Sequence, residues 1–476
     1  MRVLVRADAG AELGAGHLMR CLALAQALRA RGAEVSFACR PLPGFAPAMV
    51  TGQGFALHLL EGAAEHPPAP AQPYHWAVVD HYGLGAEWEA QARAYAGRVL
   101  AIDDLADRAH ACDGLLDHNL SASAERYAPW LPASAEGLFG PRYALLRPIF
   151  SQGPRPLAER VGRVLVNFGG FDAAGMALRA VQALQAWPDL AVEVVAGRGN
   201  PALATLQALL RGRPGSECVE VCQELGERMA RADLIVGAGG GSSLERAALG
   251  VPSLCVAVAD NQVAGATRLA EAGAHLYLGE AAHLQPGQLE GALGLLLANA
   301  PLRRSLAARG LELVDGQGTA RVARWLFAST LRLRPAVGDD AQLLFDGRNA
   351  AAVRAASLNP APLSWPMHQA WLAATLQDPH RALLVAEAGD GPVGSVRLDR
   401  QAPGEAEISL YLFEARLGQG WGGALLAAAH AWLAAQWPDV LRLNAQVLPG
   451  NGASQRLFRQ AGYRALPQHF QFDREP

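Results

Sequence analysis

Residues 8–17 have the sequence DAGAELGAGH and lie between an apolar run, Val3 to Val5, and a helical pattern that begins at Leu18. The apolar run is typical of a short buried strand, and the apolar residues after Leu18 recur at roughly helical spacing. The glycine-rich segment therefore occupies a strand-to-helix turn, which is where open α/β sheets bind ligands. Gly14 and Gly16 would let backbone N–H groups approach a ligand, because glycine has no Cβ.

His17 stands in the first turn of the helix that follows this segment. The partial positive charge of a helix N-terminus disfavours imidazolium, so we expect a neutral ring that can accept a proton at physiological pH. The alternative is that His17 merely ends a turn. The flanking glycines and the polar clusters described next favour a catalytic role.

Short apolar runs alternate with helical stretches from Met1 to about Phe150, which predicts a parallel, doubly wound sheet. Polar clusters follow three of these runs: Asp80-His81-Tyr82, Asp103-Asp104 and Asp117-His118-Asn119. Each cluster alone could be turn or capping chemistry. Three clusters at the carboxyl edge of one sheet predict a ligand crevice there.

The same succession of strand and glycine-rich turn starts again near Arg155. The strongest example is the run Leu234 to Val236, which leads into Gly237-Ala238-Gly239-Gly240-Gly241-Ser242-Ser243. Consecutive glycines expose N–H groups just ahead of a predicted helix, and such a turn binds anions. We expect a diphosphate to bind at Gly239, Gly240, Gly241, Ser242 and Ser243.

Glu245 would lie in the first turn of that helix and could accept hydrogen bonds from ribose hydroxyls. Ser242-x-x-Glu245 is also the pattern of a capping box, and this alternative stays open. A further strand, Val251 to Ala259, ends in Asp260-Asn261-Gln262, which we expect at the same crevice. Two Rossmann-like halves that face a cleft, with the nucleotide in the second half, form the GT-B arrangement.

The remaining sequence has a different pattern, with a hairpin about Gly389 to Gly391 and a strand at Ile408 to Leu412. A glycine-rich turn, Gly418 to Gly423, then opens a helix and forms a second candidate anion pocket. The expected segments are a first Rossmann-like domain at 1–152, a nucleotide-binding domain at 153–331, a linker at 332–341 and an α+β domain at 342–476.

The composition excludes several classes of function. The formal net charge is −3 and there is no basic run, which argues against nucleic acid as a partner. All 41 basic residues are arginine, so neither a Schiff-base lysine nor a Walker lysine is present. The scattered cysteines contain no C-x-x-C pair, and neither a signal sequence nor a membrane span is predicted. We therefore expect a cytoplasmic protein without membrane contact.

Residues 1–331 resemble the UDP-2,4-diacetamido-2,4,6-trideoxy-β-L-altropyranose hydrolases of pseudaminic acid biosynthesis, which are similar to GT-B glycosyltransferases. The matching segments are Ala7-Asp8, Gly14-x-Gly16-His17-x-Met19-Arg20-Cys21-Leu22, Asp80-His81-Tyr82, Ile102-Asp103-Asp104-Leu105, Tyr143-x-Leu145-Leu146-Arg147-Pro148 and Asp260-Asn261-Gln262. The resemblance implies an inverting hydrolysis that needs no metal and releases the free sugar and UDP.

The resemblance also implies roles for individual residues. His17 would take a proton from the attacking water, and the backbone amides of Gly239 to Ser243 would bind the departing UDP. Glu245 would hold the ribose, and Arg20 is the candidate for a cation beside the diphosphate, because no Asp-x-Asp metal motif occurs. The full set of expected substrate contacts is Gly14, Gly16, Arg20, Asp80, Tyr82, Asn261 and Gln262.

Residues 342–476 resemble GNAT acetyltransferases, and Ser364-Trp365-Pro366-x-His368-x-x-Trp371 is similar to the sugar-nucleotide N-acetyltransferases of the same pathway. The resemblance implies acetyl-CoA as cosubstrate and the 4-amino group of UDP-4-amino-4,6-dideoxy-N-acetyl-β-L-altrosamine as acceptor. Expected acetyl-CoA contacts are Leu410, Leu412, Gly418, Gly420, Gly422, Gly423 and Asn451.

The sequence departs from the GNAT pattern at two positions. Leu417 replaces the usual Gln or Arg, and Phe458 replaces the usual tyrosine acid. Tyr411 or water could supply the proton, or the step needs no acid, and Glu407 is a conceivable base for the amine. Glu407 could equally be a solvated residue at a strand end.

Two other functions stay open beside the bifunctional enzyme. One is a GT-B glycosyltransferase that passes a UDP-sugar to an acceptor other than water, fused to an acetyltransferase. The other is a non-catalytic nucleotide-sugar-binding module tethered to an acetyltransferase. His17 and the intact glycine turns favour the hydrolase.

Overall fold

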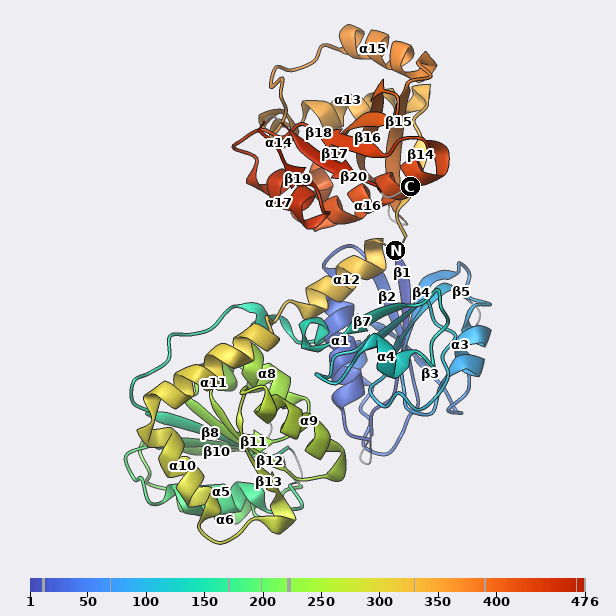
Figure 1. Ribbon diagram of the computed structural model, residues 1–476. Coiled ribbons are helices and arrows are strands. Elements are labelled where there is room, and N and C mark those ends of the chain that lie inside the picture. Colours follow the sequence, from blue (N-terminus) through green and yellow to red (C-terminus); the bar gives the residue numbers. More distant parts are fainter. Residues whose placement is uncertain are drawn as a thin grey trace. The chain divides into compact units, whose positions relative to one another are not determined.

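The computed structural model describes residues 1–10, 13–68, 70–169, 172–197, 199–220, 224–328, 330–388, 391–467 and 469–474. Three sheets follow one another along the chain (Figure 1). The first two are parallel and the third is mixed, which confirms the predicted fold class of two doubly wound domains followed by an α+β domain. Within these ranges no helix is both long and apolar enough to cross a bilayer.

The first sheet has the order β3-β2-β1-β4-β5-β6-β7. Its strands are β1 (Arg2–Ala7), β2 (Glu34–Cys39), β3 (Ala56–Leu59), β4 (Tyr74–Asp80), β5 (Ala96–Ile102), β6 (Gly114–Asp117) and β7 (Glu136–Phe139). Its helices are α1 (Gly16–Arg29), α2 (Ala48–Thr51), α3 (Ala86–Ala92) and α4 (Ala124–Tyr127). The run Val3 to Val5 is fully buried in β1, as expected for a strand covered on both faces.

The order of the first sheet reverses between β1 and β4, because the chain runs outward from β1 to β3 and then returns to β4. The loops at the carboxyl ends of these two strands diverge to opposite faces of the sheet. Such a switch point is the usual ligand site of an open parallel sheet. The glycine-rich segment follows β1, and Asp80 ends β4.

The second sheet repeats this topology in the order β10-β9-β8-β11-β12-β13. Its strands are β8 (Arg163–Asn167), β9 (Ala191–Val195), β10 (Glu217–Val219), β11 (Leu234–Ala238), β12 (Ser253–Ala257) and β13 (Leu276–Glu280). Its helices are α5 (Met176–Leu184), α6 (Leu203–Leu210), α7 (Leu225–Arg231), α8 (Ser242–Ala248), α9 (Asp260–Glu271), α10 (Gln288–Ala298) and α11 (Ala300–Leu313), and α12 (Gly318–Ala328) follows them. Here the switch point lies between β8 and β11.

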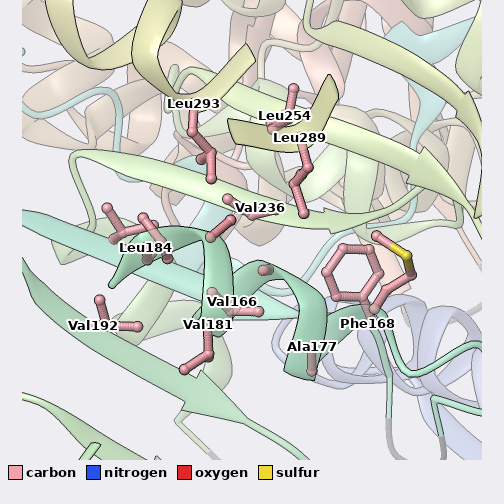
Figure 2. Close-up of a cluster of buried hydrophobic side chains, with 14 of the residues drawn as sticks. Val166, Phe168, Ala177, Val181, Leu184, Val192, Val236, Leu254, Leu289 and Leu293 are labelled. Atoms are coloured by element: carbon pink, nitrogen blue, oxygen red, sulfur yellow. The ribbon is translucent and has the colours of Figure 1, made fainter. Parts of the chain in front are cut away.

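The core of the second domain lies between its sheet and the helices α5 and α10. Figure 2 shows Val166 and Val236 from the strands beside Leu184 of α5 and Leu293 of α10. All four side chains are inaccessible to solvent. This packing stabilises the strand ends from which the glycine-rich turn extends.

The third sheet has the order β14-β15-β16-β17-β18-β20-β19. Its strands are β14 (Arg332–Pro335), β15 (Arg381–Ala388), β16 (Gly391–Ala402), β17 (Glu405–Leu412), β18 (Arg442–Ala445), β19 (Arg464–Ala465) and β20 (Phe470–Asp473). Its helices are α13 (Ala341–Asn349), α14 (Ala351–Ala355), α15 (Trp365–Gln377), α16 (Trp421–Gln436) and α17 (Gly452–Gln460). Of the predicted hairpin turn, Gly389 and Asp390 lie outside the described residues.

The segment 332–341, which we predicted to be a linker, contributes a strand to this sheet. Its residues 332–335 form β14 and pair antiparallel with β15. Arg334 also binds the carboxylates of Asp340 and Glu387, so its side chain is fixed as well as its backbone. Pro335 is compatible with this position because it ends an edge strand. The linker prediction was wrong for these residues.

Strands β17 and β18 are parallel and pair only at their beginnings. Glu405 to Glu407 pair with Arg442 to Asn444, and among the described residues no pairing of these two strands continues beyond Glu407. The second half of β17, Ile408 to Leu412, is therefore hydrogen-bonded to β16 alone. Its other edge offers backbone groups to a ligand.

Candidate active sites

His17 and Asp80 form a close pair at the switch point of the first sheet. His17 lies in the first turn of α1, as predicted, and its Nδ1 is 2.6 Å from Oδ1 of Asp80. Both residues are buried. The carboxylate accepts the Nδ1 hydrogen, which leaves Nε2 of a neutral ring as the proton acceptor.

Arg20 binds the same carboxylate with two hydrogen bonds. Its Nε donates to Oδ2 of Asp80 at 2.6 Å and its Nη2 donates to Oδ1 at 2.7 Å. Burial alone would raise the pKa of Asp80, but the charge and hydrogen bonds of Arg20 and the contact with His17 hold it well below its usual range. We predicted Asp80 and Arg20 as substrate contacts, and the structure instead joins them to each other beneath His17.

Tyr82 and His118 complete this cluster. The ring of Tyr82 meets that of His17 edge-on at 4.6 Å between centroids, and its hydroxyl lies 3.4 Å from Oδ2 of Asp104. Burial and the charge of Asp104 raise the pKa of Tyr82 to about 12, so the phenol remains a donor. Burial and the charge of Arg20 lower the pKa of His118 to about 3, so this imidazole is neutral.

The glycine-rich segment folds back on itself before α1. Gly10 and Gly14 exchange two backbone hydrogen bonds, and Gly14 has a left-handed φ of +74°. The N–H of Gly14 is thus used within the loop, whereas Gly16 begins the helix. Of the segment, Ala11 and Glu12 lie outside the described residues.

The turn Gly239–Ser243 follows β11 at the second switch point. Oε1 of Gln262 accepts the N–H groups of Gly239, at 3.2 Å, and of Val258, at 3.1 Å. Gln262 therefore fixes the conformation of the turn. The N–H of Gly239 is not available to a phosphate. Within the described ranges, the N–H groups of Gly240 and Gly241 donate to no protein acceptor.

Glu245 lies in the first turn of α8, but the capping box does not form. The helix begins at Ser242 after an N-cap at Gly241, and this cap has no side-chain hydrogen bond. Oε1 of Glu245 instead lies 3.6 Å from the guanidinium of Arg147. Burial raises the pKa of Glu245, and Arg147 opposes this shift. Asn261 is exposed near the start of α9 and is accessible to a ligand.

A cavity of about 1110 Å³ lies in the third domain. All seven residues predicted to bind acetyl-CoA line it: Leu410, Leu412, Gly418, Gly420, Gly422, Gly423 and Asn451. Gly418 and Gly420 have left-handed φ angles of +72° and +83°, which favour glycine. Gly422 and Gly423 lie in the first turn of the 16-residue helix α16, where N–H groups are unsatisfied.

Asn451 has a structural function in addition to its place on the cavity wall. Its side chain accepts the N–H of Ser454 at 3.0 Å and caps α17. Phe458 is buried against Tyr463 and Phe470, so no acid stands at the position where GNAT enzymes usually have tyrosine. Tyr411 lines the cavity and donates to the carbonyl of Leu344 at 3.2 Å. Burial raises the pKa of Tyr411 to about 12.

Sequence reasoning missed two arginines on the same cavity wall, Arg348 and Arg397. Nη2 of Arg348 donates to the carbonyl of Asn359 at 2.7 Å, and Nε of Arg397 donates to Asp399 at 2.8 Å. Burial and the positive charges of Arg354 and Arg397 lower the pKa of Arg348. The two residues belong to no motif, and only the fold of the third domain brings them to one cavity.

Comparison with known proteins defines the class of the C-terminal part. Residues 330–464 match the family model described as "Acetyltransferase (GNAT) domain". The match includes β14, in agreement with its place in the third sheet. The chain therefore joins a pair of parallel-sheet domains to a GNAT domain.

The N-terminal region matches two characterised proteins. It is 28% identical over 211 residues to UDP-2,4-diacetamido-2,4,6-trideoxy-beta-L-altropyranose hydrolase of Campylobacter jejuni, over 44% of this chain and 73% of that protein. It is 29% identical over 188 residues to the spore coat polysaccharide biosynthesis protein SpsG of Bacillus subtilis, over 38% of this chain. The match spans 56% of SpsG, a little over half of its length.

Solved structures similar to the chain include a MurG and an N-acetyltransferase. MurG of Acinetobacter baumannii is 17% identical, with a TM-score of 0.49, over 68% of this chain and 99% of that structure. Spermidine N-acetyltransferase of Vibrio cholerae, in complex with CoA and spermine, is 14% identical, with a TM-score of 0.29, over 31% of this chain and 96% of that structure.

Proposed function

We propose that the chain catalyses two steps on one nucleotide sugar. The GNAT domain transfers an acetyl group from acetyl-CoA to the 4-amino group of UDP-4-amino-4,6-dideoxy-N-acetyl-β-L-altrosamine. The first two domains then hydrolyse the product, UDP-2,4-diacetamido-2,4,6-trideoxy-β-L-altropyranose, to the free sugar and UDP. Similarity to the Campylobacter hydrolase supports the second step, and the GNAT match supports the first. The two steps belong together in pseudaminic acid biosynthesis.

The observation that carries the hydrolase proposal is the contact of 2.6 Å between His17 and Asp80. Nε2 of His17 takes a proton from water as its oxygen attacks the anomeric carbon. The bond from that carbon to the glycosidic oxygen breaks, and its electron pair stays on the departing UDP, with inversion at the carbon. Asp80 stabilises the imidazolium that forms, and Arg20 keeps Asp80 ionised.

The turn after β11 supports departure of the nucleotide. The N–H groups of Gly240 and Gly241 are unsatisfied by the described protein and suit a phosphate oxygen. Glu245 would accept the ribose hydroxyls, because its carboxylate is not used as a cap. Tyr82 and Asn261 would hold the sugar.

The cavity of the third domain supports acetyl transfer to an anionic acceptor. The first turn of α16 would bind the pyrophosphate of acetyl-CoA, and the unpaired edge of β17 would hold its pantetheine arm. Arg348 and Arg397 would bind the diphosphate of the acceptor. Glu407 would take the proton of the amine as its nitrogen attacks the thioester carbon, and Tyr411 would protonate the departing CoA thiolate.

The test adds the 4-amino UDP-sugar and acetyl-CoA to the full chain and follows the sugar by NMR. We expect the acetylated nucleotide first, and then free diacetamido sugar and UDP. A matched sample without acetyl-CoA should release no diacetamido sugar. If the acetylated nucleotide accumulates without hydrolysis, the hydrolase proposal fails. A transferase that uses another acceptor would behave in this way, because water is the only acceptor supplied.

A further inference from the structure

Arg246 lies directly behind the glycine-rich turn of the second domain. It is in α8, and only 1% of its surface is exposed. Its guanidinium donates to the carbonyl of Ala238 at 2.9 Å and to the hydroxyls of Ser243 at 2.8 Å and Ser242 at 3.1 Å. All three acceptors belong to the turn or to the last residue of β11.

The charge of this guanidinium is attracted only by a carboxylate at a distance. Among the described residues no carboxylate forms an ion pair with Arg246, and the carboxylate of Glu245, which attracts the guanidinium from further away, lies 3.6 Å from Arg147. The thiol of Cys255 is 3.9 Å away, but burial raises its pKa and keeps it neutral. Burial and the charge of Arg246 lower the pKa of His275 to about 4, so this neighbour is neutral too.

A buried charge without a partner is costly, and a folded protein that keeps one needs a reason. Arg303, in the same domain, shows how a buried arginine is usually stabilised. It is 2% exposed, and it donates to the carbonyls of Leu296 and Leu297, at the C-terminal end of α10. The partial negative charge of that helix end compensates the guanidinium. Arg246 donates instead to one carbonyl and two hydroxyls, and its Nε has no hydrogen-bond partner.

The chain also makes room for Arg246. A Cβ on Gly237 would lie 2.9 Å from Nη1 of Arg246 and 2.7 Å from the carbonyl oxygen of Asn167. Glycine is therefore required in the middle of a buried strand, where it otherwise weakens the sheet. This close approach indicates that the backbone of β11 is shaped to accommodate the guanidinium.

We propose that Arg246 supplies the positive charge that balances a nucleoside diphosphate bound on the other side of the turn. The inference rests on the nucleotide site of the proposed function and extends it. Arg246 is a positioning residue, because it acts through the turn and does not touch the ligand. Its charge acts at a distance, since the surrounding protein has a low dielectric constant. The hydroxyl of Ser242 accepts from Arg246 and keeps its own hydrogen for a phosphate oxygen.

The experiment measures binding of UDP and of uridine to the full chain by calorimetry. Uridine carries the same base and ribose but no charge, so the ratio of the two affinities reports the electrostatic contribution. We expect Arg246→Met to weaken UDP binding by about 30-fold or more, the lower end of the effect of truncating a buried charge partner. Uridine binding should change less than about twofold, since no charge interaction is lost.

Two further variants separate charge from shape. Arg246→Lys keeps the charge but cannot reach all three acceptors, so it should keep most of the preference for UDP over uridine. Arg303→Met removes the other buried arginine and should leave both affinities unchanged. If Arg246→Met fails to fold, the ratio of UDP affinity to uridine affinity in Arg246→Lys still tests the inference.

Three results would overturn the inference. Equal losses of UDP and uridine affinity in Arg246→Met would show that the arginine only shapes the turn. An unchanged affinity for UDP would remove Arg246 from binding, and so would a lysine variant that has lost its preference for UDP. If the wild-type chain binds no UDP, the nucleotide site itself is refuted together with this inference.

Discussion

The two parallel sheets have the same strand order and the same switch point, but they present different chemistry there. The first sheet presents ionisable side chains, and the carboxylate of Asp80 is paired with Arg20 and hydrogen-bonded to His17. The second presents backbone N–H groups and the guanidinium of Arg246, which forms no ion pair with any described carboxylate. The first arrangement suits the movement of a proton, and the second suits the retention of an anion.

The difference begins with the residue that ends the fourth strand in spatial order. Asp80 ends β4 and directs a carboxylate toward the start of α1. Ala238 ends β11 and offers its carbonyl to Arg246, and three glycines follow it. A side chain can exchange a proton, whereas a backbone amide provides only a fixed dipole. Topology therefore sets the place of a site, and a few residues set its chemistry.

Replacement of His17 tests the first half of this comparison most strongly. We expect His17→Asn to lower the rate of sugar release by about 1000-fold, within the usual range of 10²–10⁴ for a general base. Asparagine has similar size and polarity but cannot take a proton at this pH. The measurement is release of free sugar from the acetylated UDP-sugar, followed by NMR.

Acetylation is the internal control for that variant, because His17 lies in the first domain and the cavity lies in the third. When the variant is given the 4-amino UDP-sugar and acetyl-CoA instead, acetylation should proceed at the wild-type rate. A release rate equal to that of the wild type would remove His17 from the mechanism.

Replacement of Asp80 should have the next largest effect. Asp80→Asn leaves an amide that can donate to His17 and disturb its tautomer, and it removes the negative charge that Arg20 binds with two hydrogen bonds. We expect sugar release to fall by about 100-fold, as is typical when a reacting group is misplaced. Breaking a buried ion pair also costs about 3–5 kcal/mol of stability. Hydrogen exchange of peptides that cover β4 and β5 measures this loss in the intact chain.

The stability contributed by Asp80 should depend on pH in a defined direction. Its pKa in the folded chain lies below the unfolded value of about 4. The contribution is therefore complete above about pH 4 and is lost as the pH falls further. Wild-type exchange protection in β4 should fall toward that of Asp80→Asn between about pH 4 and pH 2. A difference that stays constant over that range would contradict the ion-pair account.

Much of this arrangement follows from the sequence, and the rest depends on contacts between distant residues. Apolar runs followed by glycine or acidic clusters predict both parallel sheets and the turns at which the candidate sites lie, because strand and turn signals are local. The partnership of Asp80 with His17 spans 63 positions and depends on the register of β1 with β4. Arg246 belongs to no motif, and its proposed role depends on a three-dimensional arrangement in which no described carboxylate forms an ion pair with it.

The segment 332–341 was mispredicted for a different reason. Pro335 and Gly338 are typical breaker residues, and they led to the prediction of a loop at 332–341. Residues 332–335 form a strand because β15 offers a free edge and Arg334 finds two carboxylates there. Tertiary contacts outweigh local propensity in such short segments.

Gln262 tests whether the second site depends on a rigid turn. Gln262→Leu removes the acceptor of two N–H groups, those of Gly239 and Val258, at similar side-chain volume. We expect UDP affinity to fall by about tenfold, which corresponds to the net value of one or two hydrogen bonds. Calorimetry with UDP measures the change. Sugar release at saturating substrate should change much less, and a loss of release without a loss of affinity would place Gln262 in the chemical step.

Tyr82 offers the smallest and most selective test of the first site. Its ring contacts His17 edge-on, while its hydroxyl lies 3.4 Å from Asp104, at the long end of hydrogen-bond distances. Tyr82→Phe keeps the ring and should lower kcat/KM for sugar release by about threefold, the value of one weak neutral hydrogen bond to the sugar. Tyr82→Ala also removes the ring that packs on the imidazole, so its loss should be larger and should appear in kcat. Equal losses in the two variants would assign the whole effect to the hydroxyl and would leave His17 oriented by Asp80 alone.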